Sequence, residues 1–318
     1  MEIKLYGVRG SIPTPATNDF DTRMYGGNTT CLEVIADSGD EYILDAGSGI
    51  RVLGNELMKK EFGKGQGKAK VLLSHIHWDH IHGWPFFVPA YIPGNEFEIY
   101  GGRKSDEKLE EALKEQGICS ITQAAFEKQQ SKYVFPIRLN QMPSTIEFYD
   151  LDEGYTINNG LRVGYTELNH PDGVYSYKLE EKEKTFIYAT DTEHDGEIKG
   201  EKFGSMDKKL IKWIKGADIL YYDGQYAPEE YNPEQYGLKG MPKIGWGHST
   251  YEKGVEIAIE ANVKTLVLGH HDPAHDDNYL DNLEKRAQTY MKEKLRELGR
   301  VESEIEVILA KEGMSLSL

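Results

Sequence analysis

Cysteine is scarce in this 318-residue chain, which contains only Cys31 and Cys119. Two thiols cannot build the disulfide framework that stabilises small secreted domains, so we expect both to be reduced. Long apolar runs are also missing, since no stretch approaches the ~20 consecutive apolar residues that span a bilayer. The first residues lack the basic and apolar regions of a signal peptide. These absences exclude a disulfide scaffold and a membrane protein, and they favour a cytoplasmic enzyme.

Basic residues are in deficit as well. The chain has 37 lysines and arginines against 53 aspartates and glutamates, a net charge of −16. Such a charge repels a polyanion at long range, so we expect a small-molecule substrate and do not expect binding to a long nucleic acid. A basic, glycine-rich stretch at residues 59–68 is short and is predicted to be an exposed loop. No repeat and no low-complexity linker divides the chain, which predicts a single domain over residues 1–318.

Histidine and aspartate, by contrast, are concentrated in a short segment. His75, His77, Asp79 and His80 lie within six residues, directly after the apolar run at residues 71–73. Neutral imidazole nitrogen and carboxylate oxygen together suit zinc-like divalent cations. The segment therefore predicts a metal site. A polar loop that is merely rich in histidine is the alternative.

Three further candidate ligands occur downstream. His170, Asp191 and His270 each follow a short apolar run rich in β-branched or aromatic residues, which predicts a buried strand. Taken singly, either histidine is more typical of a hydrogen-bonded structural residue, and Asp191 is equally typical of a helix N-cap. As a set, all three are expected at one edge of a sheet, together with the first cluster. This recurrence favours a metallohydrolase.

The pattern along the rest of the chain is that of an α/β protein. Strands are predicted at residues 3–6, 30–36, 42–44, 71–73, 161–165, 175–179 and 186–190, and helices at residues 50–62, 104–116, 208–215, 251–261 and 279–298. Three prolines make a loop the expectation for residues 85–100. Residues 118–149 show no clean period and carry no prediction.

The order of these ligands, His-x-His-x-Asp-His followed by His, Asp and His, resembles the metallo-β-lactamase superfamily. The resemblance extends from Gly7-Val8-Arg9-Gly10 to His270-His271-Asp272-Pro273. It is closest to the phosphodiesterase branch that includes tRNase Z and cyclic-nucleotide phosphodiesterases. The Asp-Ala-Gly-Ser-Gly motif at residues 45–49 and the Gly-His-Ser-Thr motif at residues 247–250 support this narrower match. The fold it implies is an α/β, four-layer αββα sandwich.

The resemblance also implies a dinuclear metal site and assigns its ligands. One cation would be held by His75, His77 and His170, the other by Asp79, His80 and His270, with Asp191 as the bridge. Zinc is the expected metal and manganese the alternative. Two cations that share a hydroxide can attack a phosphodiester and stabilise its oxygens. Asp79 is accordingly expected to serve catalysis as well as metal binding.

His248 is the expected proton donor for the leaving oxygen, because an imidazole can carry out acid–base catalysis near neutral pH and this one lies outside the implied ligand set. In the tRNase Z branch a matching histidine works with a glutamate. Here the apparent counterpart is Asp223, and its shorter side chain leaves a direct contact between the two residues open. The alternative for His248 is a place near a helix N-terminus, where Ser249 or Thr250 is the cap.

Residues in glycine-rich loops and beside the metal motifs are weaker candidates. Arg9 and Asn28 are predicted to contact a substrate phosphate, with tight-turn structure as the alternative. His82 and His271 are expected to hydrogen-bond the ligands, and His194 and His275 to be solvated. The aromatic residues that flank the motifs are candidates to stack on a nucleobase, with core packing as the alternative: Trp84, Phe86, Phe87, Tyr91 and Trp246.

The sequence thus favours a dinuclear-metal phosphodiesterase that acts on a small phosphodiester, with a cyclic nucleotide as the best-fitting substrate. A tRNase Z-like RNA 3′-end endonuclease is the alternative with the same chemistry. A non-hydrolytic di-metal redox or sensor protein is the alternative of another class. Such relatives usually carry glutamate where this chain has His77, which disfavours that reading. A homodimer is a further expectation, because many members of the superfamily complete each other's active-site mouth.

Overall fold

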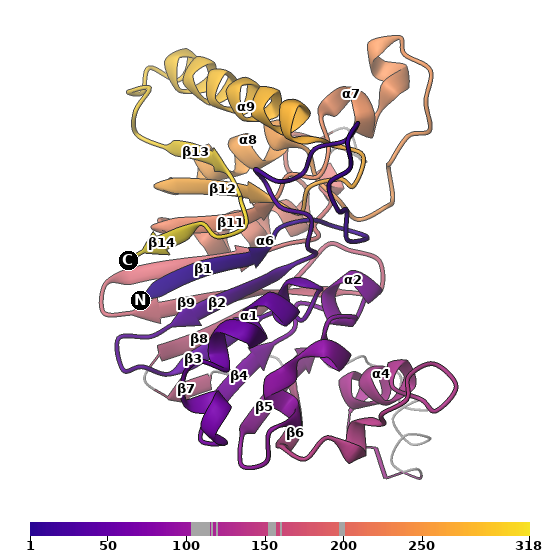
Figure 1. Cartoon of the computed structure of the whole chain (residues 1–318). Helices are drawn as coiled ribbons and strands as arrows, with labels where there is room; N and C mark the ends of the chain where they lie inside the picture. Colours follow the sequence, from indigo (N-terminus) through magenta and orange to yellow (C-terminus); the bar gives the residue numbers. More distant parts are fainter. Residues whose placement is uncertain (103–114, 116, 119, 152–156, 160, 197–200) are drawn as a thin grey trace.

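The computed structural model of the chain describes residues 1–102, 115, 117–118, 120–151, 157–159, 161–196 and 201–318. Within these residues two mixed β-sheets lie face to face (Figure 1). The first sheet has the order β14 (Ser315–Ser317), β1 (Glu2–Gly7), β2 (Cys31–Ile35), β3 (Glu41–Leu44), β4 (Lys68–Leu72), β5 (Glu96–Gly102) and β6 (Thr145–Leu151). The second has the order β13 (Glu306–Leu309), β12 (Thr265–Gly269), β11 (Ile219–Asp223), β10 (Lys184–Ala189), β9 (Val174–Glu181), β8 (Leu161–Leu168) and β7 (Ile157–Asn159).

Helices cover the outer face of each sheet. The first sheet is flanked by α1 (Gly49–Leu57), α2 (Trp78–Ile81), α4 (Ile121–Gln129) and the 3-10 turns η1 (Glu61–Lys64), η2 (Trp84–Phe86), η3 (Val88–Tyr91) and η4 (Leu139–Gln141). The second is flanked by α6 (Ser205–Ile214), α8 (Tyr251–Ala261) and α9 (Asp277–Glu297), with α7 (Pro228–Tyr231) and η5 (Pro233–Tyr236) at its end. None of the described helices combines the length and apolar character needed to cross a bilayer.

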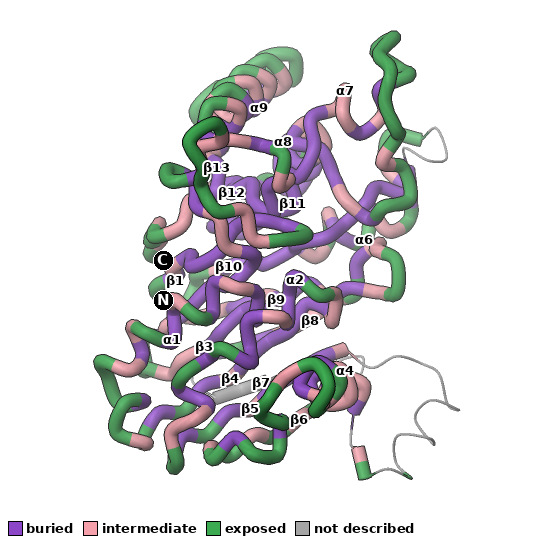
Figure 2. The backbone as a smooth tube through the Cα atoms, turned by 45° about the vertical axis from the view of Figure 1, so that its right-hand side comes forward, coloured by how far each residue is buried: buried purple, intermediate pink, exposed green. Residues whose placement is uncertain are grey.

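The central strands of the second sheet, β10, β11 and β12, are buried on both faces, which explains their largely apolar sequence. In β10, Phe186 and Tyr188 pack between the two sheets, while Ile187 and Ala189 pack beneath the helices. A third apolar cluster lies between the first sheet and α1. Figure 2 shows the central strands as mostly buried and α9 as a mixture of buried, intermediate and exposed residues. The predicted four-layer αββα sandwich is therefore confirmed, whereas the assignment of residues 1–318 to a single domain stays a prediction.

Most predicted helices are present, with shifts at their ends. The helix predicted at residues 251–261 matches α8, and those at residues 208–215 and 279–298 match α6 and α9 closely. The helix predicted at residues 50–62 ends at Leu57, because the backbone becomes extended at Lys60 and a 3-10 turn buries Phe62. The helix predicted at residues 104–116 lies outside the described residues apart from Glu115.

The segment without a clean period contains α4 and β6. In β6 the exposure of successive residues alternates between exposed and partly buried, and the strand pairs with β5 in parallel. Within the described residues β6 is an edge strand with a neighbouring strand on one side only, and polar residues occupy half of its positions. This mixed composition hid the strand from sequence reasoning. The 3-10 turns η2 and η3 occupy part of the segment that was predicted as a loop.

Two carboxylates, Glu33 and Glu41, share one face of strands β2 and β3. Burial, with the neighbouring Glu33, raises the pKa of Glu41 to about 9. A raised folded-state pKa stabilises the protein below the unfolded pKa, and this stabilisation is lost as the pH rises toward 9. We expect Glu41→Gln to remove this pH-dependent loss. The free energies of unfolding of the two proteins should then diverge by at most about 1.4 kcal/mol per pH unit. Urea unfolding of both proteins in chelator at pH 5, 7 and 9 measures it; parallel pH profiles would contradict the assignment.

Candidate metal centre

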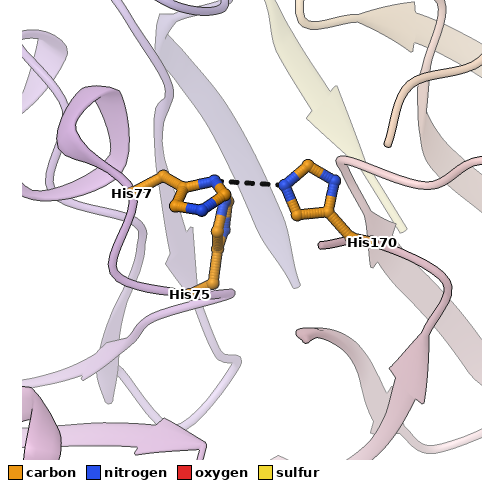
Figure 3. A group of neighbouring side chains, drawn as sticks. All are labelled: His75, His77 and His170. Atoms are coloured by element: carbon orange, nitrogen blue, oxygen red, sulfur yellow. Dashed lines mark hydrogen bonds between the residues drawn. The ribbon is translucent and has the colours of Figure 1, made fainter. Parts of the chain in front are cut away.

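The predicted ligands lie at one end of the two facing sheets. His75 and His77 follow β4, Asp79 and His80 lie in α2, and His170, Asp191 and His270 follow β8, β10 and β12. Their potential ligand atoms form overlapping groups in which all atoms lie within 4.8 Å of one another: His75, His77 and His170; Asp79, His80 and His270; and His75, His80 and Asp191. Figure 3 shows His77 and His170 pointing toward each other from opposite sides, with His75 below. The structure thus brings all seven together.

Distances between the facing atoms fit shared cations. His77 Nδ1 lies 3.1 Å from His170 Nε2, and His80 Nε2 lies 3.3 Å from His270 Nε2. Two ligands held at about 2.0–2.1 Å on a tetrahedral zinc are about 3.3 Å apart. Both imidazole pairs therefore have the separation of two ligands on one ion.

Asp191 lies between the two groups. One carboxylate oxygen, Oδ2, is 3.6 Å from His75 Nε2 and 3.4 Å from His80 Nε2, while Oδ1 is 3.2 Å from His270 Nε2. Asp79 Oδ2 is 3.3 Å from both His80 Nε2 and His270 Nε2. A side chain whose two oxygens face histidines of different groups has the geometry of a bridge.

The outer nitrogens of these imidazoles are occupied, which leaves the inner ones for metal. His80 Nδ1 faces Asp45 Oδ2 at 2.8 Å, His170 Nδ1 donates to the Gly247 carbonyl at 2.8 Å, and His270 Nδ1 donates to Gln225 Oε1 at 3.0 Å. Metal-binding histidines typically have this arrangement, because the outer hydrogen bond fixes the tautomer and the ring. His75 Nε2 is buried without a hydrogen-bond partner. The donor set therefore fits two divalent cations.

Electrostatics place Asp191, Asp79 and His75 in the protonation states that metal ligands need. For His270, by contrast, Asp191 and Asp79 raise the pKa to about 9 against the effect of burial, so a cation bound there would displace a proton. Burial would raise the pKa of Asp191, but His270 and His80 hold it well below its usual range. Burial would also raise the pKa of Asp79, but His80 and His270 lower it. Burial lowers the pKa of His75 well below its ordinary value. Ionised carboxylates and a neutral imidazole are the binding forms.

Asp45 is buried next to the cluster and positions its residues by hydrogen bonds. Its buried carboxylate accepts hydrogen bonds from Ser74 N at 2.7 Å, Ser74 Oγ at 2.8 Å and Tyr188 Oη at 2.6 Å, besides its contact with His80. Sequence reasoning quoted the motif at residues 45–49 but gave Asp45 no role. The available signal was its position directly after a buried strand, which it shares with Asp191.

Three of these residues have strained backbone. Asp45, Asp191 and His270 adopt φ values of 59°, 50° and 58°, in the left-handed region that non-glycine residues rarely occupy. Each directly follows, or lies at the end of, a parallel strand. Such strain persists where the surrounding structure enforces it, and it is common at functional sites.

Gly10 lies against the ring of His270, and this contact allows a test. A Cβ atom at residue 10 would be 2.3 Å from Cε1 of His270 and 2.4 Å from its Nδ1. We expect Gly10→Ala to displace the ring and weaken binding of one of two cations about tenfold or more. Zinc titration against a competing chelator measures both affinities. Gly164→Ala, which meets only Trp213 at 3.2 Å, is the control; equal affinities in both variants would refute the expectation.

His248 and Asp223 form the direct pair that the sequence left open. His248 Nδ1 lies 2.9 Å from Asp223 Oδ2, and Asp223 also accepts hydrogen bonds from the backbone N–H groups of Gln225 and Thr192. The His248 ring stacks on that of His270 with a centroid separation of 5.0 Å. Both residues also group with Asp191 and His270, but their mutual contact occupies one atom of each.

His248 lies two residues before the N-cap of a helix, as the alternative expected, but it is not itself the cap. The N-cap of α8 is Thr250, whose hydroxyl accepts a hydrogen bond from Lys253 N at 3.3 Å. His248 therefore does not cap the helix, and its ring remains beside the metal cluster.

Arg9 and Asn28 have structural contacts, and the prediction of a phosphate contact needs correction. Arg9 is fully buried and donates hydrogen bonds to the carbonyls of Gly26, Asp272 and His275. The Asn28 amide donates to Glu312 Oε2 and accepts from Ser48 Oγ, each at 3.0 Å. Both side chains hold loops together through these hydrogen bonds, while Arg9 Nη2 is buried without a hydrogen-bond partner.

The remaining histidines depart from expectation. His194 and His275, predicted to be solvated, are 2% and 3% exposed; His275 contacts Glu230 Oε1 at 2.9 Å. His271 Nε2 donates to the Ala310 carbonyl and His82 Nδ1 to the Trp78 carbonyl, both at 2.8 Å. His82 and His271 are therefore positioned by hydrogen bonds to backbone carbonyls, and not by the predicted hydrogen bonds to metal ligands.

The segment after Asp191 connects the cluster to its surroundings, and sequence reasoning missed it. Glu193 accepts hydrogen bonds from Gly245 N and Gly247 N. His194 lies 2.9 Å from Asp207 Oδ1 and 3.0 Å from Ser249 Oγ, and is bonded to Tyr222 Oη at 2.7 Å. The signal was the unbroken run of polar residues after a buried strand. This segment couples the bridge position to the loop that carries His248.

Comparisons with known proteins agree with this geometry. A family model described as a beta-lactamase superfamily domain matches residues 41–271. Ribonuclease Z of Prochlorococcus marinus subsp. pastoris is 22% identical over 316 aligned residues, which cover 86% of this chain and 89% of that protein.

Two solved structures share the fold over nearly the whole chain. The metallo-beta-lactamase fold protein YhfI from Bacillus subtilis superposes with a TM-score of 0.64 at 19% identity, covering 99% of this chain and 98% of that one. A diphosphatase from the PhnP family superposes with a TM-score of 0.60 at 17% identity, covering 100% and 97%. The chain is thus similar in sequence to ribonuclease Z and in fold to the PhnP-family diphosphatase. With its family match over more than half of the sequence and its His/Asp cluster between two facing sheets, the chain belongs to the metallo-β-lactamase superfamily.

Proposed function

We propose that this protein is a dinuclear-metal phosphodiesterase that hydrolyses a small phosphodiester, with a cyclic nucleotide as the substrate that fits best. The observation that carries the proposal is the pair formed by His248 and Asp223 at 2.9 Å, next to the cluster. A hydrolase that cleaves an alkyl phosphodiester must protonate a poor leaving oxygen, and an oriented imidazole meets this need.

The roles of the residues follow from their contacts. Two bound cations would supply Lewis acidity and lower the pKa of a water. His75, His77 and His170 would hold one, Asp79, His80 and His270 the other, and Asp191 would bridge them. As a water oxygen bonds to phosphorus and the bond to the leaving oxygen breaks, His248 Nε2 donates its proton to that oxygen. Asp223 accepts from Nδ1 and keeps Nε2 directed at the site.

Charge supports a small substrate. The net charge of −16 repels a long polyanion, whereas one phosphodiester is neutralised locally by the cations. Zinc is the proposed metal and manganese the alternative, since imidazole and carboxylate donors accept both.

A ribonuclease Z-like endonuclease is the second candidate, favoured by the sequence relationship to ribonuclease Z. It would use the same His/Asp cluster on a larger substrate. Cleavage of precursor tRNA at its 3′ end, at rates above those for cyclic nucleotides, would favour this candidate. The acidic charge opposes it.

The test is a substrate screen with metal-reconstituted protein. We expect hydrolysis of bis-p-nitrophenyl phosphate and of at least one cyclic nucleotide, with products identified by mass, and loss of both activities in chelator. Fully metallated protein that cleaves a lactam or a thioester but no phosphodiester would refute the proposal. Metal analysis on the same preparation separates it from a non-hydrolytic iron protein.

A further inference from the structure

Trp246 is an exposed aromatic residue whose backbone is held firmly beside the cluster. Its side chain is 47% exposed. The residues on both sides donate their N–H groups to the buried carboxylate of Glu193, Gly245 at 2.6 Å and Gly247 at 3.0 Å. The Gly247 carbonyl in turn accepts the hydrogen bond from His170. The indole is therefore presented to solvent one residue away from a contact of the metal site, and little backbone entropy remains to be lost on binding.

Close packing enforces this presentation. Gly245 and Gly247 adopt φ values of 84° and 86°. A Cβ atom at residue 247 would lie 2.1 Å from His170 Nδ1. Glycine is therefore required at this position. In Figure 1 the chain after α7 projects from the sheets before it returns to the site.

Lys243 adds a positive charge to the same surface. Its Nζ lies 4.2 Å from the centroid of the Trp246 ring and 5.9 Å from that of Tyr226. Among the described residues no carboxylate forms an ion pair with this partly buried ammonium group, although the chain carries a net charge of −16. The charge is therefore available to an anionic group of a ligand.

The position of these residues relative to His248 gives the subsite a direction. The Tyr226 ring meets the His248 ring edge-on with a centroid separation of 6.1 Å, so the same ring neighbours both His248 and the Lys243 ammonium group. In the proposed function, on which this step rests, His248 protonates the leaving oxygen. The leaving oxygen of a cyclic nucleotide belongs to the ribose that carries the base. The base is therefore brought to the side of Lys243 and Trp246.

We propose that Trp246 and Lys243 form a nucleotide-binding subsite, in which the exposed indole stacks on the base and the ammonium group binds an anionic oxygen of the same nucleotide. An indole stacks on any base. The subsite should therefore favour substrates that carry a base over those that lack one, without distinguishing among the bases. Two other aromatic residues near the metal motifs, Trp84 and Phe87, are fully buried and pack in the core. They cannot take this role.

The experiment compares substrates with and without a base. With 2′,3′-cyclic AMP we expect Trp246→Ala to raise KM about tenfold while metal content is unchanged, because stacking on a base accounts for a factor of this order. With glycerol 1,2-cyclic phosphate, which has no base, KM should stay within twofold of wild type. Trp246→Phe, which keeps an aromatic face, should recover most of the loss. Lys243→Ala, like Trp246→Ala, should raise KM for the nucleotide.

A matched control is present elsewhere in the chain. Lys132 Nζ lies 4.7 Å from the ring of Tyr133, which is 87% exposed. Tyr133→Ala removes a similar pair and should leave both KM values unchanged. Equal KM changes for both substrates in Trp246→Ala, or no change for either, would overturn the subsite.

A binding measurement keeps this test separate from that of the proposed function. By calorimetry the metal-loaded protein should bind AMP about tenfold more tightly than ribose 5-phosphate, and Trp246→Ala should abolish the preference. This result supports the subsite even in a protein that hydrolyses no phosphodiester. Hydrolysis of both diesters without any preference for AMP would overturn the subsite and leave the proposed function intact.

Discussion

Asp191→Ala should abolish hydrolysis of bis-p-nitrophenyl phosphate, with a fall of at least about a thousandfold, and leave fewer than two metal ions bound per chain. The reason is its place between the two groups of ligands, within 3.6 Å of nitrogens from His75, His80 and His270. Without the carboxylate, the cations lose their shared anionic ligand, and Lewis-acid stabilisation of several kcal/mol is lost. Elemental analysis after dialysis measures the metal, and initial rates measure the activity.

Thermal unfolding provides a second readout of the same variant. Ions that bind the folded chain stabilise it by mass action, so chelator should lower the Tm of the wild type and have a smaller effect on Asp191→Ala. Asp277→Asn is the control, because this buried aspartate accepts hydrogen bonds from Met24 N and Tyr25 N, away from the cluster. The control should keep its metal. A full complement of tightly bound metal in Asp191→Ala would contradict the bridging role.

His248→Ala should lower kcat for a cyclic nucleotide by about 10²–10⁴-fold, the usual contribution of a general acid, and should keep its metal. With bis-p-nitrophenyl phosphate the loss should be smaller than tenfold, because p-nitrophenolate departs without a proton. The ratio of the two losses is the measured quantity. It separates proton donation from a general disturbance of the site, which would slow both substrates equally.

Asp223→Asn is the companion variant. The amide keeps the size of the side chain, but its uncharged oxygen is a weaker acceptor for the Nδ1–H group of a His248 ring that carries protons on both nitrogens. We expect a loss in the same direction as for His248→Ala, again confined to the poor leaving group. Depletion of metal from either variant would instead make these residues ligands, a reading that their grouping with Asp191 and His270 also permits geometrically.

Much of the fold could be predicted from local patterns. Buried strands such as β10 and β12 are unbroken apolar runs because both of their faces are covered. Helix α8 has a polar cap, Thr250, at its start and Asn262 in the left-handed region after its last turn. The edge strand β6 escaped prediction because one half of its residues faces solvent.

Several candidate ligands could also be predicted, because they lie shortly after strands and parallel strands end at the same edge of a sheet. His270 and Asp191 follow β12 and β10, which lie on either side of β11, parallel to it. Their convergence with His75 and His80 therefore followed from the order of residues along the chain. The predictions about Arg9 and Asn28 failed because a glycine-rich loop can face either a ligand or another loop.

The chain's order of residues was enough to assign its superfamily fold and the composition of its His/Asp cluster, because these depend on strand ends and short motifs, whereas the direct contact of His248 with Asp223 was decided by the tertiary structure. The contacts of Asp45, Glu193 and Arg9 depended on the packing of segments far apart in sequence. Asp45 reaches Tyr188 on the other sheet, and Arg9 reaches the carbonyl of His275. Whether a buried polar side chain binds a ligand or the protein itself is set by which neighbours arrive, and those neighbours meet only when the two sheets close on each other.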